Sequence, residues 1–306
     1  MAELILHHFD LSPFAEKARL MLGLKRLAWR SVPIPLVMPK PDLTALTGGY
    51  RKTPVLQVGA DVYCDTKLIA VELERRCPEP TLFPGGNRGL ALALSAWSDR
   101  SFFDPGAGLS MGLNKRGLPK EILDDRKAFF NFMNFDVLEE EIPHLHSQLR
   151  AQADLVEQQL ADGRPFLLGD APGLADVNAY FPVWMARGNV PTAGTIFAAY
   201  GRLAAWERRM AAIGHGTRTE MAPAEAHAVA RASTPEPGRG VDPADPLGLA
   251  VGDAVAVTPD DYGKVPVAGE LVTLQLHEVA VRRTDPKCGT VVVHFPRIGY
   301  RVERAA

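Results

Sequence analysis

Cysteine is scarce in this chain of 306 residues, which holds only Cys64, Cys77 and Cys288. No two of them form a C-x-x-C pair, and an odd, sparse count argues against a disulfide framework. No apolar run approaches the roughly 20 residues that a membrane-spanning helix needs. The first residues lack a basic segment followed by a long apolar stretch, so we expect no secretory signal. These absences predict a cytoplasmic protein.

The chain also lacks an excess of charge of either sign. Lys and Arg number 34 against 36 Asp and Glu, which gives a formal net charge of −2. Such a balance carries no electrostatic signature of nucleic acid or of an anionic membrane as partner. The chain is 46% hydrophobic and 23% charged, which is typical of a globular protein with enough core for two or three domains.

The first quarter of the chain alternates strand and helix signals in the order of a small α/β unit. Ser12 and Pro13 form a helix start, because serine caps a helix and proline is tolerated at the first helical position. A helix crossing between the first two strands makes those strands parallel. The predicted elements are a strand at 4–9, a helix from 13, a strand at 29–34, an irregular stretch at 39–49, a hairpin of 53–58 and 62–64, and a helix at 65–76.

The remainder is helical and then changes to β periodicity. Apolar residues recur at helical spacing from 88 to about 233, and Pro and Gly then mark a linker. After residue 247 the period is two, which predicts a small all-β domain of the SH3-like barrel type. The predicted strands are 254–258, 270–276, 278–282 and 290–295, and the predicted domains are 1–85, 86–233 and 247–306, joined by a linker at 234–246.

Three features of the first domain suit a ligand that carries a thiol, a peptide backbone, an ammonium group and a carboxylate. Ser12 stands at a strand–helix junction, where free N–H groups and a hydroxyl favour an anion. A hydrogen bond to a charged group contributes about 1.5–3 kcal/mol, so this junction could lower the pKa of a bound thiol by roughly one to two units. Thr53, held before a cis Pro54, would offer its backbone to an extended peptide. Asp65 can bind an ammonium group, and Thr66 with the helix N–H groups can bind a carboxylate.

Four ordered motifs resemble cytosolic glutathione S-transferases. Residues 12–20, SPFAEKARL, resemble the active-site turn and are closest to the omega-like pattern, with Ser12 where Cys is usual. The other motifs are KTPVL at 52–56, similar to the cis-proline motif, DTKLI at 65–69, similar to the acidic-Ser motif, and LAD at 174–176, similar to the buried-Asp motif.

The resemblance implies a thioredoxin-like N-terminal domain, an all-helical C-terminal domain, a homodimer, no metal, and glutathione as co-substrate with a small apolar electrophile. It also implies the site residues. Ser12 would donate to the thiolate, Phe14, Thr53 and Pro54 would contact the peptide, Asp65 and Thr66 would hold the γ-glutamyl head, and Lys40 and Lys52 are candidates for the glycine carboxylate.

The chain departs from the family pattern in three places. Ser12 removes the protein thiol that mixed-disulfide chemistry needs, which favours thiolate activation for conjugation. Gly173 stands where Ser or Thr usually caps the helix that follows, so we expect that helix start to be less firmly held. The β segment after about residue 241 lies outside the ordinary transferase pattern, and its Tyr262, His294 and Arg297 have no predicted site.

Plainer interpretations stand beside these. Ser12 and Asp65–Thr66 could be helix caps only, although the neighbouring motifs favour ligand roles. We expect Asp176 to be a buried structural hydrogen-bonding residue, and His7 and His8 to be core residues rather than parts of the pocket. The alternative functions are a glutathione-dependent isomerase or dehalogenase, and a non-catalytic binding or regulatory protein that uses the β domain for contacts.

Overall fold

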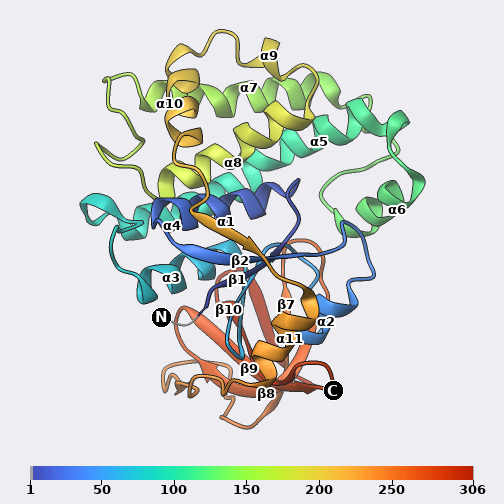
Figure 1. Cartoon of the computed structure of the whole chain (residues 1–306). Coiled ribbons are helices and arrows are strands. Elements are labelled where there is room, and N and C mark those ends of the chain that lie inside the picture. Colours follow the sequence, from blue (N-terminus) through green and yellow to red (C-terminus); the bar gives the residue numbers. More distant parts are fainter. Residues whose placement is uncertain (1–2, 306) are drawn as a thin grey trace. The chain divides into compact units, whose positions relative to one another are not determined.

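The computed structural model describes residues 3–305 and divides into two compact units. The first unit combines the chain up to Ala15, residues 28–72 and the chain from Thr217 onward. The second combines residues 16–27 and 73–216. In Figure 1 the strands lie in the first unit, and most of the helices lie in the second. The domain boundaries predicted from the sequence stay a prediction.

The first quarter of the chain has the predicted α/β arrangement. Strand β1 (Ile5–His8) pairs in parallel with β2 (Ala28–Pro33) and antiparallel with β3 (Val55–Val58), which pairs with β4 (Asp61–Cys64). Helix α1 (Pro13–Leu24) follows β1, and α3 (Thr66–Arg76) follows β4. This is the expected thioredoxin-like order.

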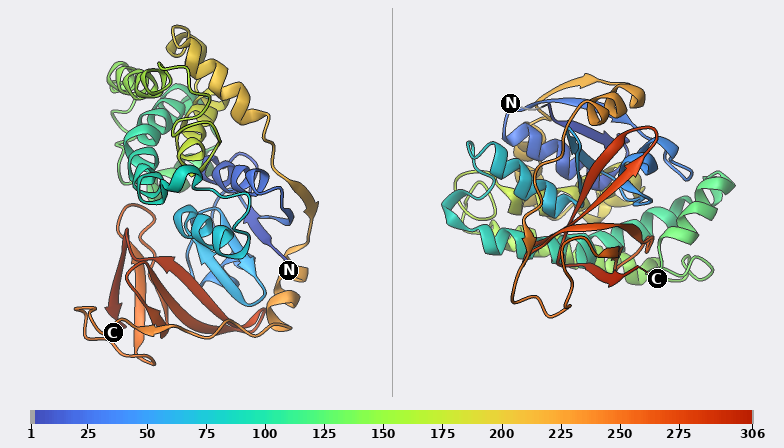
Figure 2. Two further views of the ribbon diagram at one scale, coloured as in Figure 1. Left: turned by 90° about the vertical axis from the view of Figure 1, so that its left-hand side faces the viewer. Right: turned by 90° about the horizontal axis from the view of Figure 1, so that it is seen from below.

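Five further strands make up the C-terminal β region, which we define as residues 254–304. They pair antiparallel in the order β11-β7-β8-β9-β10, and β10 then pairs in parallel with β4, with Val293 opposite Val62. The expected extra β region is therefore present, and its strands continue the N-terminal sheet (Figure 2). Their bounds are β7 (Ala254–Pro259), β8 (Val267–Leu274), β9 (Glu278–Asp285), β10 (Gly289–Pro296) and β11 (Tyr300–Arg304).

One hydrophobic core serves both parts of this sheet. Val55, Val62 and Cys64 from the N-terminal hairpin belong to the same buried cluster as Val293 and Phe295 of β10. The cluster arises because the β10–β4 pairing places alternate side chains of both strands on one face. The predicted linker also joins the sheet, since β6 (Gly240–Val241) pairs with β8.

Two short elements correct the sequence-based assignment. Helix α2 (Pro41–Thr47) lies where an irregular stretch was predicted. The helix buries Leu43 and Leu46, and Gly48 ends it in a left-handed conformation (φ 75°). Strand β5 (Thr217–Glu220), expected to be helical, pairs in parallel with β2. All four residues of β5 are exposed, so no apolar pattern indicates it.

Helix α11 (Pro223–Arg231) contacts α2 and the sheet within the first unit (Figure 1). Strand β11 was also absent from the sequence-based assignment. Its residues alternate between buried and exposed only over Tyr300 to Glu303, which is too short for the pattern alone to establish a strand.

The second unit is helical, as predicted, and α5, α7 and α8 lie side by side in it (Figure 1). No helix within residues 3–305 has both the length and the apolar character for a membrane span. The bounds are α4 (Arg88–Ala96), α5 (Phe103–Asn114), α6 (Lys120–Phe129), α7 (Ile142–Gln159), α8 (Leu174–Asn189), α9 (Ala193–Ile196) and α10 (Gly201–Ala211).

Asp176 fixes the start of α8. Its buried carboxylate accepts hydrogen bonds from Leu167 N at 2.8 Å, Trp206 Nε1 at 2.9 Å and Gly173 N at 3.0 Å. Burial raises the pKa of Asp176, and these donors stabilise the charged form. This is the structural role that the sequence predicted.

Contrary to the expectation from the sequence, Gly173 does not loosen the start of α8. A Cβ at this position would lie 2.6 Å from Pro84 Cδ and 2.9 Å from Leu82 O. Only glycine allows this approach, in which Leu174 N donates to Leu82 O at 2.8 Å. The close contact and Asp176 together hold the helix start that a capping side chain would otherwise hold.

Candidate functional site

The sheet register brings the three predicted junctions to one edge. His7 of β1 lies opposite Val55 of β3, which lies opposite Cys64 of β4. Ser12 follows β1, Thr53 precedes β3, and Asp65 follows β4, so all three leave the sheet on the same side. Ends of adjacent strands are about 5 Å apart, which suits a ligand of peptide length.

Ser12 caps α1. Its hydroxyl oxygen accepts a hydrogen bond from Ala15 N at 3.2 Å, and its own N–H donates to Phe9 O at 3.1 Å. The side chain is buried, and Phe14 beside it is half-buried. A serine hydroxyl has one donor and two acceptor positions, so accepting from Ala15 leaves its proton to donate elsewhere. Capping and donation to a ligand are compatible roles.

His7 and His8 have structural partners, as expected. His7 Nε2 lies 2.8 Å from Gln57 Oε1, and His8 Nε2 lies 3.0 Å from Ser31 Oγ. Burial lowers the pKa of His7 to about 4, so its ring is neutral near pH 7. His7 therefore supplies no positive charge to this edge.

Lys40 and Thr53 meet beside Pro54. The buried Lys40 ammonium lies 3.5 Å from Thr53 Oγ1 and 3.4 Å from Arg51 O, and 5.3 Å from the centre of the Phe9 ring. The Thr53–Pro54 peptide bond is cis, as the sequence suggested. The Lys40 ammonium and the start of β3 therefore lie together at this edge of the sheet.

Lys52 has partners that sequence reasoning missed. Its ammonium pairs with Asp261 and lies 4.4 Å from the centre of the Tyr262 ring. Both partners come from the turn after β7, which the β10–β4 pairing brings to this edge. No local sequence signal links residues about 210 positions apart, so only the sheet topology reveals the pair.

Asp65 lies at the turn from β4 into α3, with a backbone φ of 74°. Its Oδ1 accepts from Lys67 N at 2.9 Å, which caps α3, and its Oδ2 accepts from Tyr300 Oη at 3.2 Å. Left-handed backbone is uncommon outside glycine, and Asp is among the residues that tolerate it. Thr66, the first residue of α3, is buried. Tyr300 is a further residue here whose contact with the site the sequence did not indicate.

Cys64 ends β4 at this edge and is a free thiol. The free cysteines are all buried, and burial raises the pKa of Cys64 far above its ordinary value. Within residues 3–305, no three His, Cys, Asp or Glu side chains are arranged to hold a metal.

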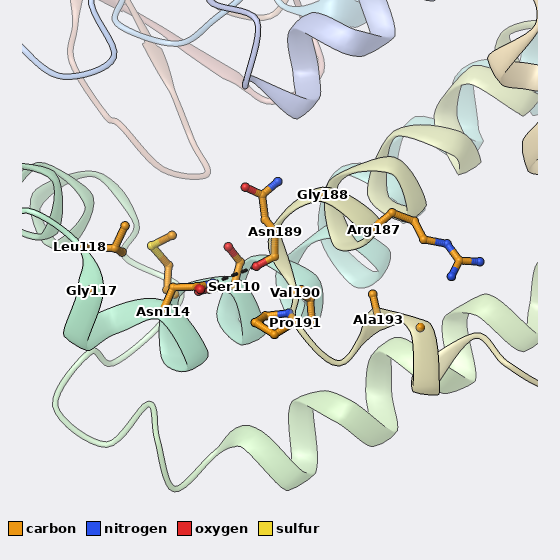
Figure 3. Close-up of a pocket in the computed structure, with 12 residues that line it drawn as sticks. Ser110, Asn114, Gly117, Leu118, Arg187, Gly188, Asn189, Val190, Pro191 and Ala193 are labelled. Carbon is orange, nitrogen blue, oxygen red and sulfur yellow. Dashed lines mark hydrogen bonds between the residues drawn. The ribbon is translucent and has the colours of Figure 1, made fainter.

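A separate pocket of about 650 Å³ lies in the helical unit (Figure 3). Its lining comes from α5, α8, the start of α9 and the residues that follow α5 and α8, and Asn114 Nδ2 donates to Asn189 O at 2.8 Å. Met111 is among its lining residues, whereas none of the predicted glutathione residues is.

Two family models match the chain. Residues 6–81 match the glutathione S-transferase N-terminal domain, and residues 139–209 match the C-terminal domain. No curated protein matches the sequence.

Solved structures extend the match. A glutathione S-transferase from Rhodospirillum rubrum F11 is 24% identical over 67% of this chain and 86% of its own, with a TM-score of 0.52. A rice transferase solved in complex with glutathione is 23% identical over 68% of this chain and 86% of its own, also at 0.52. Both likenesses concern the fold, and neither spans the whole chain.

A GST-like protein from Pseudomonas syringae is similar from end to end. It is 39% identical, covers 100% of both chains and has a TM-score of 0.81. The match therefore includes the C-terminal β region, and the protein belongs to the glutathione S-transferase family.

Proposed function

We propose that this protein is a glutathione-dependent transferase that activates the glutathione thiol with Ser12. The observation that carries the proposal is the register of β1, β3 and β4, which brings Ser12, Thr53 and Asp65 to one edge of the sheet. The three positions match three chemically different parts of glutathione: a thiol, a peptide backbone and a zwitterionic amino-acid head.

Thiolate stabilisation is the chemical step assigned to Ser12. An ordinary thiol has a pKa of about 8.5, so it is mostly protonated at neutral pH. The Ser12 proton and the N-terminal amides of α1 would both stabilise the sulfur as an anion. The thiolate is the nucleophile that attacks an apolar electrophile, and holding it in place lowers the barrier further.

The remaining contacts bind and orient the tripeptide. In this proposal the Thr53 backbone pairs with the cysteinyl unit beside Pro54 and Phe14, and Lys40 or Lys52 holds the glycine carboxylate. Asp65 binds the γ-glutamyl ammonium, and Thr66 with the α3 amides binds the adjacent carboxylate.

Replacement of Ser12 by alanine tests the proposal. We expect Ser12→Ala to lower kcat/KM for conjugation of glutathione to an aryl halide by about ten- to a hundredfold, which corresponds to one charged hydrogen bond. Calorimetric affinity for glutathione should change little, and the pH at which the bound thiol ionises, followed by thiolate absorbance, should rise.

Ser147→Ala is the matched control, because the Ser147 hydroxyl donates to a backbone carbonyl on α7 in the helical unit. Unchanged turnover in Ser12→Ala would remove Ser12 from its role. Absence of glutathione binding by the unaltered protein at millimolar concentration would instead favour a non-catalytic protein of this family.

Family membership also leads us to propose a cytoplasmic homodimer. Light scattering on the eluted protein tests the assembly, and a mass equal to one chain would reject the dimer.

A further inference from the structure

Tyr300 links the C-terminal β region to the predicted ammonium site. It begins β11, where it lies opposite Pro259 of β7, and its hydroxyl lies 3.2 Å from Asp65 Oδ2. The adjoining turn is held at the same place, since Asp260 N donates to Gly299 O at 3.0 Å. A residue from the far end of the chain therefore contacts the carboxylate that follows β4.

The direction of the hydrogen bonds around Tyr300 is fixed by chemistry. An ionised carboxylate only accepts hydrogen bonds, so Tyr300 donates its single proton to Asp65. The Tyr50 hydroxyl lies 3.1 Å from the Tyr300 hydroxyl and must then donate to it. Burial raises the pKa of both phenols far above the ordinary value, and the charge of Asp65 adds to this, so both stay protonated donors.

The tyrosine pair is buried and tightly packed. Tyr50 and Tyr300 are 3% and 6% exposed, and their rings belong to the core shared with Phe295. A buried phenol that lost its partner would incur a desolvation cost, so the relay from Tyr50 through Tyr300 to Asp65 holds one arrangement.

A cation lies beside the Asp65 carboxylate in this structure. The Asp65 side chain keeps 15% exposure, and the Lys67 ammonium lies 3.7 Å from Oδ2, which shows that a group of this kind fits beside the carboxylate. The carboxylate is thus oriented from within by Tyr300 and reachable from solvent.

We propose that Tyr300, supported by Tyr50, is a positioning residue that orients Asp65 to bind the α-ammonium of the γ-glutamyl group. The C-terminal β region thereby completes the glutathione site that the first 85 residues begin. This inference rests on the proposed function, because it assigns a further residue to the same ligand.

The test compares two ligands in the full-length protein. Glutaryl-cysteinyl-glycine is glutathione without the α-ammonium, so it cannot use Asp65 in this way. We expect Tyr300→Phe, which keeps the ring and removes only the hydroxyl, to weaken calorimetric binding of glutathione by about fivefold to tenfold. The affinity of Tyr300→Phe for the glutaryl analogue should stay within about twofold of the affinity of the unaltered protein for it, because the remaining contacts are the same.

Two further variants keep the test decisive. In an Asp65→Asn background, Tyr300→Phe should cause little additional loss, because the two act as one unit. Tyr200→Phe is the matched control, since Tyr200 Oη donates to Arg150 O at 3.1 Å in the helical unit and should leave both affinities unchanged. If Tyr300→Phe does not fold, Tyr50→Phe takes its place, with a smaller loss in the same direction.

Each outcome has one meaning. Equal weakening of both ligands by Tyr300→Phe would overturn the inference, because it would mark a general structural effect, and unchanged glutathione binding would overturn it too. Either result leaves the proposed function standing. Failure of the unaltered protein to bind glutathione would reject the proposed function and this inference together.

Discussion

Lys52 and Asp65 are each contacted by the C-terminal β region. Asp261 neutralises Lys52, and Tyr300 donates to Asp65. The two contacts differ in consequence for an incoming peptide. The hydrogen bond from Tyr300 orients the Asp65 carboxylate for a cation. The Asp261 carboxylate instead competes with a carboxylate of the ligand for Lys52.

Asp261 should therefore oppose binding of the glycine carboxylate if Lys52 holds it. We expect Asp261→Asn to tighten calorimetric binding of glutathione by about two- to fivefold, which is the range of a partly exposed ion pair. The gain should shrink as salt is added, because added ions screen the charge of Lys52 in both proteins.

The neighbouring Asp260→Asn serves as the matched control, since Asp260 adjoins Gly299 and no ion pair links it to Lys52 in the described chain. Weaker binding in Asp261→Asn would mean that Asp261 orients Lys52 instead of competing for it.

At the scale of elements, His294 joins three strands. From β10 its Nε2 lies 3.0 Å from Asp61 Oδ1 on β4, and its Nδ1 lies 2.8 Å from Glu278 Oε1 on β9. The ring stacks on Tyr63 with centroids 4.5 Å apart. Burial disfavours the charged imidazole, but the two carboxylates outweigh it and raise the pKa of His294.

This arrangement predicts a pH-dependent stability. The folded pKa of His294 lies above its unfolded value of about 6.5, so its stabilisation is complete below that value and is lost as pH rises through the folded pKa. We expect His294→Gln to cost about 1–3 kcal/mol in the free energy of unfolding near pH 6, and less near pH 9. Urea denaturation at both pH values measures the difference.

Glu278 gives the control for that experiment. Burial favours its protonated form, yet hydrogen bonding and charge from His294 lower its pKa. With Glu278 replaced by Gln, the pH-dependent part of the His294→Gln effect should be smaller. An equal cost at both pH values would show that the imidazole acts only through packing.

At the scale of the molecule, the first unit is built from the two ends of the sequence. Its strands form one sheet, and Val62 of β4 and Val293 of β10 are opposed in it and buried in one core. Because the β region and the N-terminal hairpin bury each other's apolar faces, we expect them to unfold together.

Val293→Ala tests this cooperation. The lost methyl groups and the remaining cavity should cost about 1–3 kcal/mol. Amide hydrogen exchange should accelerate by a similar factor in β3, β4 and the strands of the β region, since one opening event exposes them all. Acceleration confined to β7–β11 would show that the β region opens by itself.

Local chemistry made much of this protein predictable. Ser12 and Pro13 mark the start of α1, and Asp65 marks the start of α3, because caps and fixed φ angles act over a few residues. Alternation of apolar residues predicted four of the C-terminal strands for the same reason. The exposed strand β5 was not predicted, because its pairing with β2, and not its own sequence pattern, makes it a strand.

The sequence alone indicated most of the elements, the family and the candidate glutathione residues of the first domain, because these depend on short-range spacing. Only the tertiary structure decided what the C-terminal β region does with them. The pairing of β10 with β4 is specified by burial between residues about 230 positions apart, and no local pattern records it. That one pairing brings Tyr300 to Asp65 and Asp261 to Lys52.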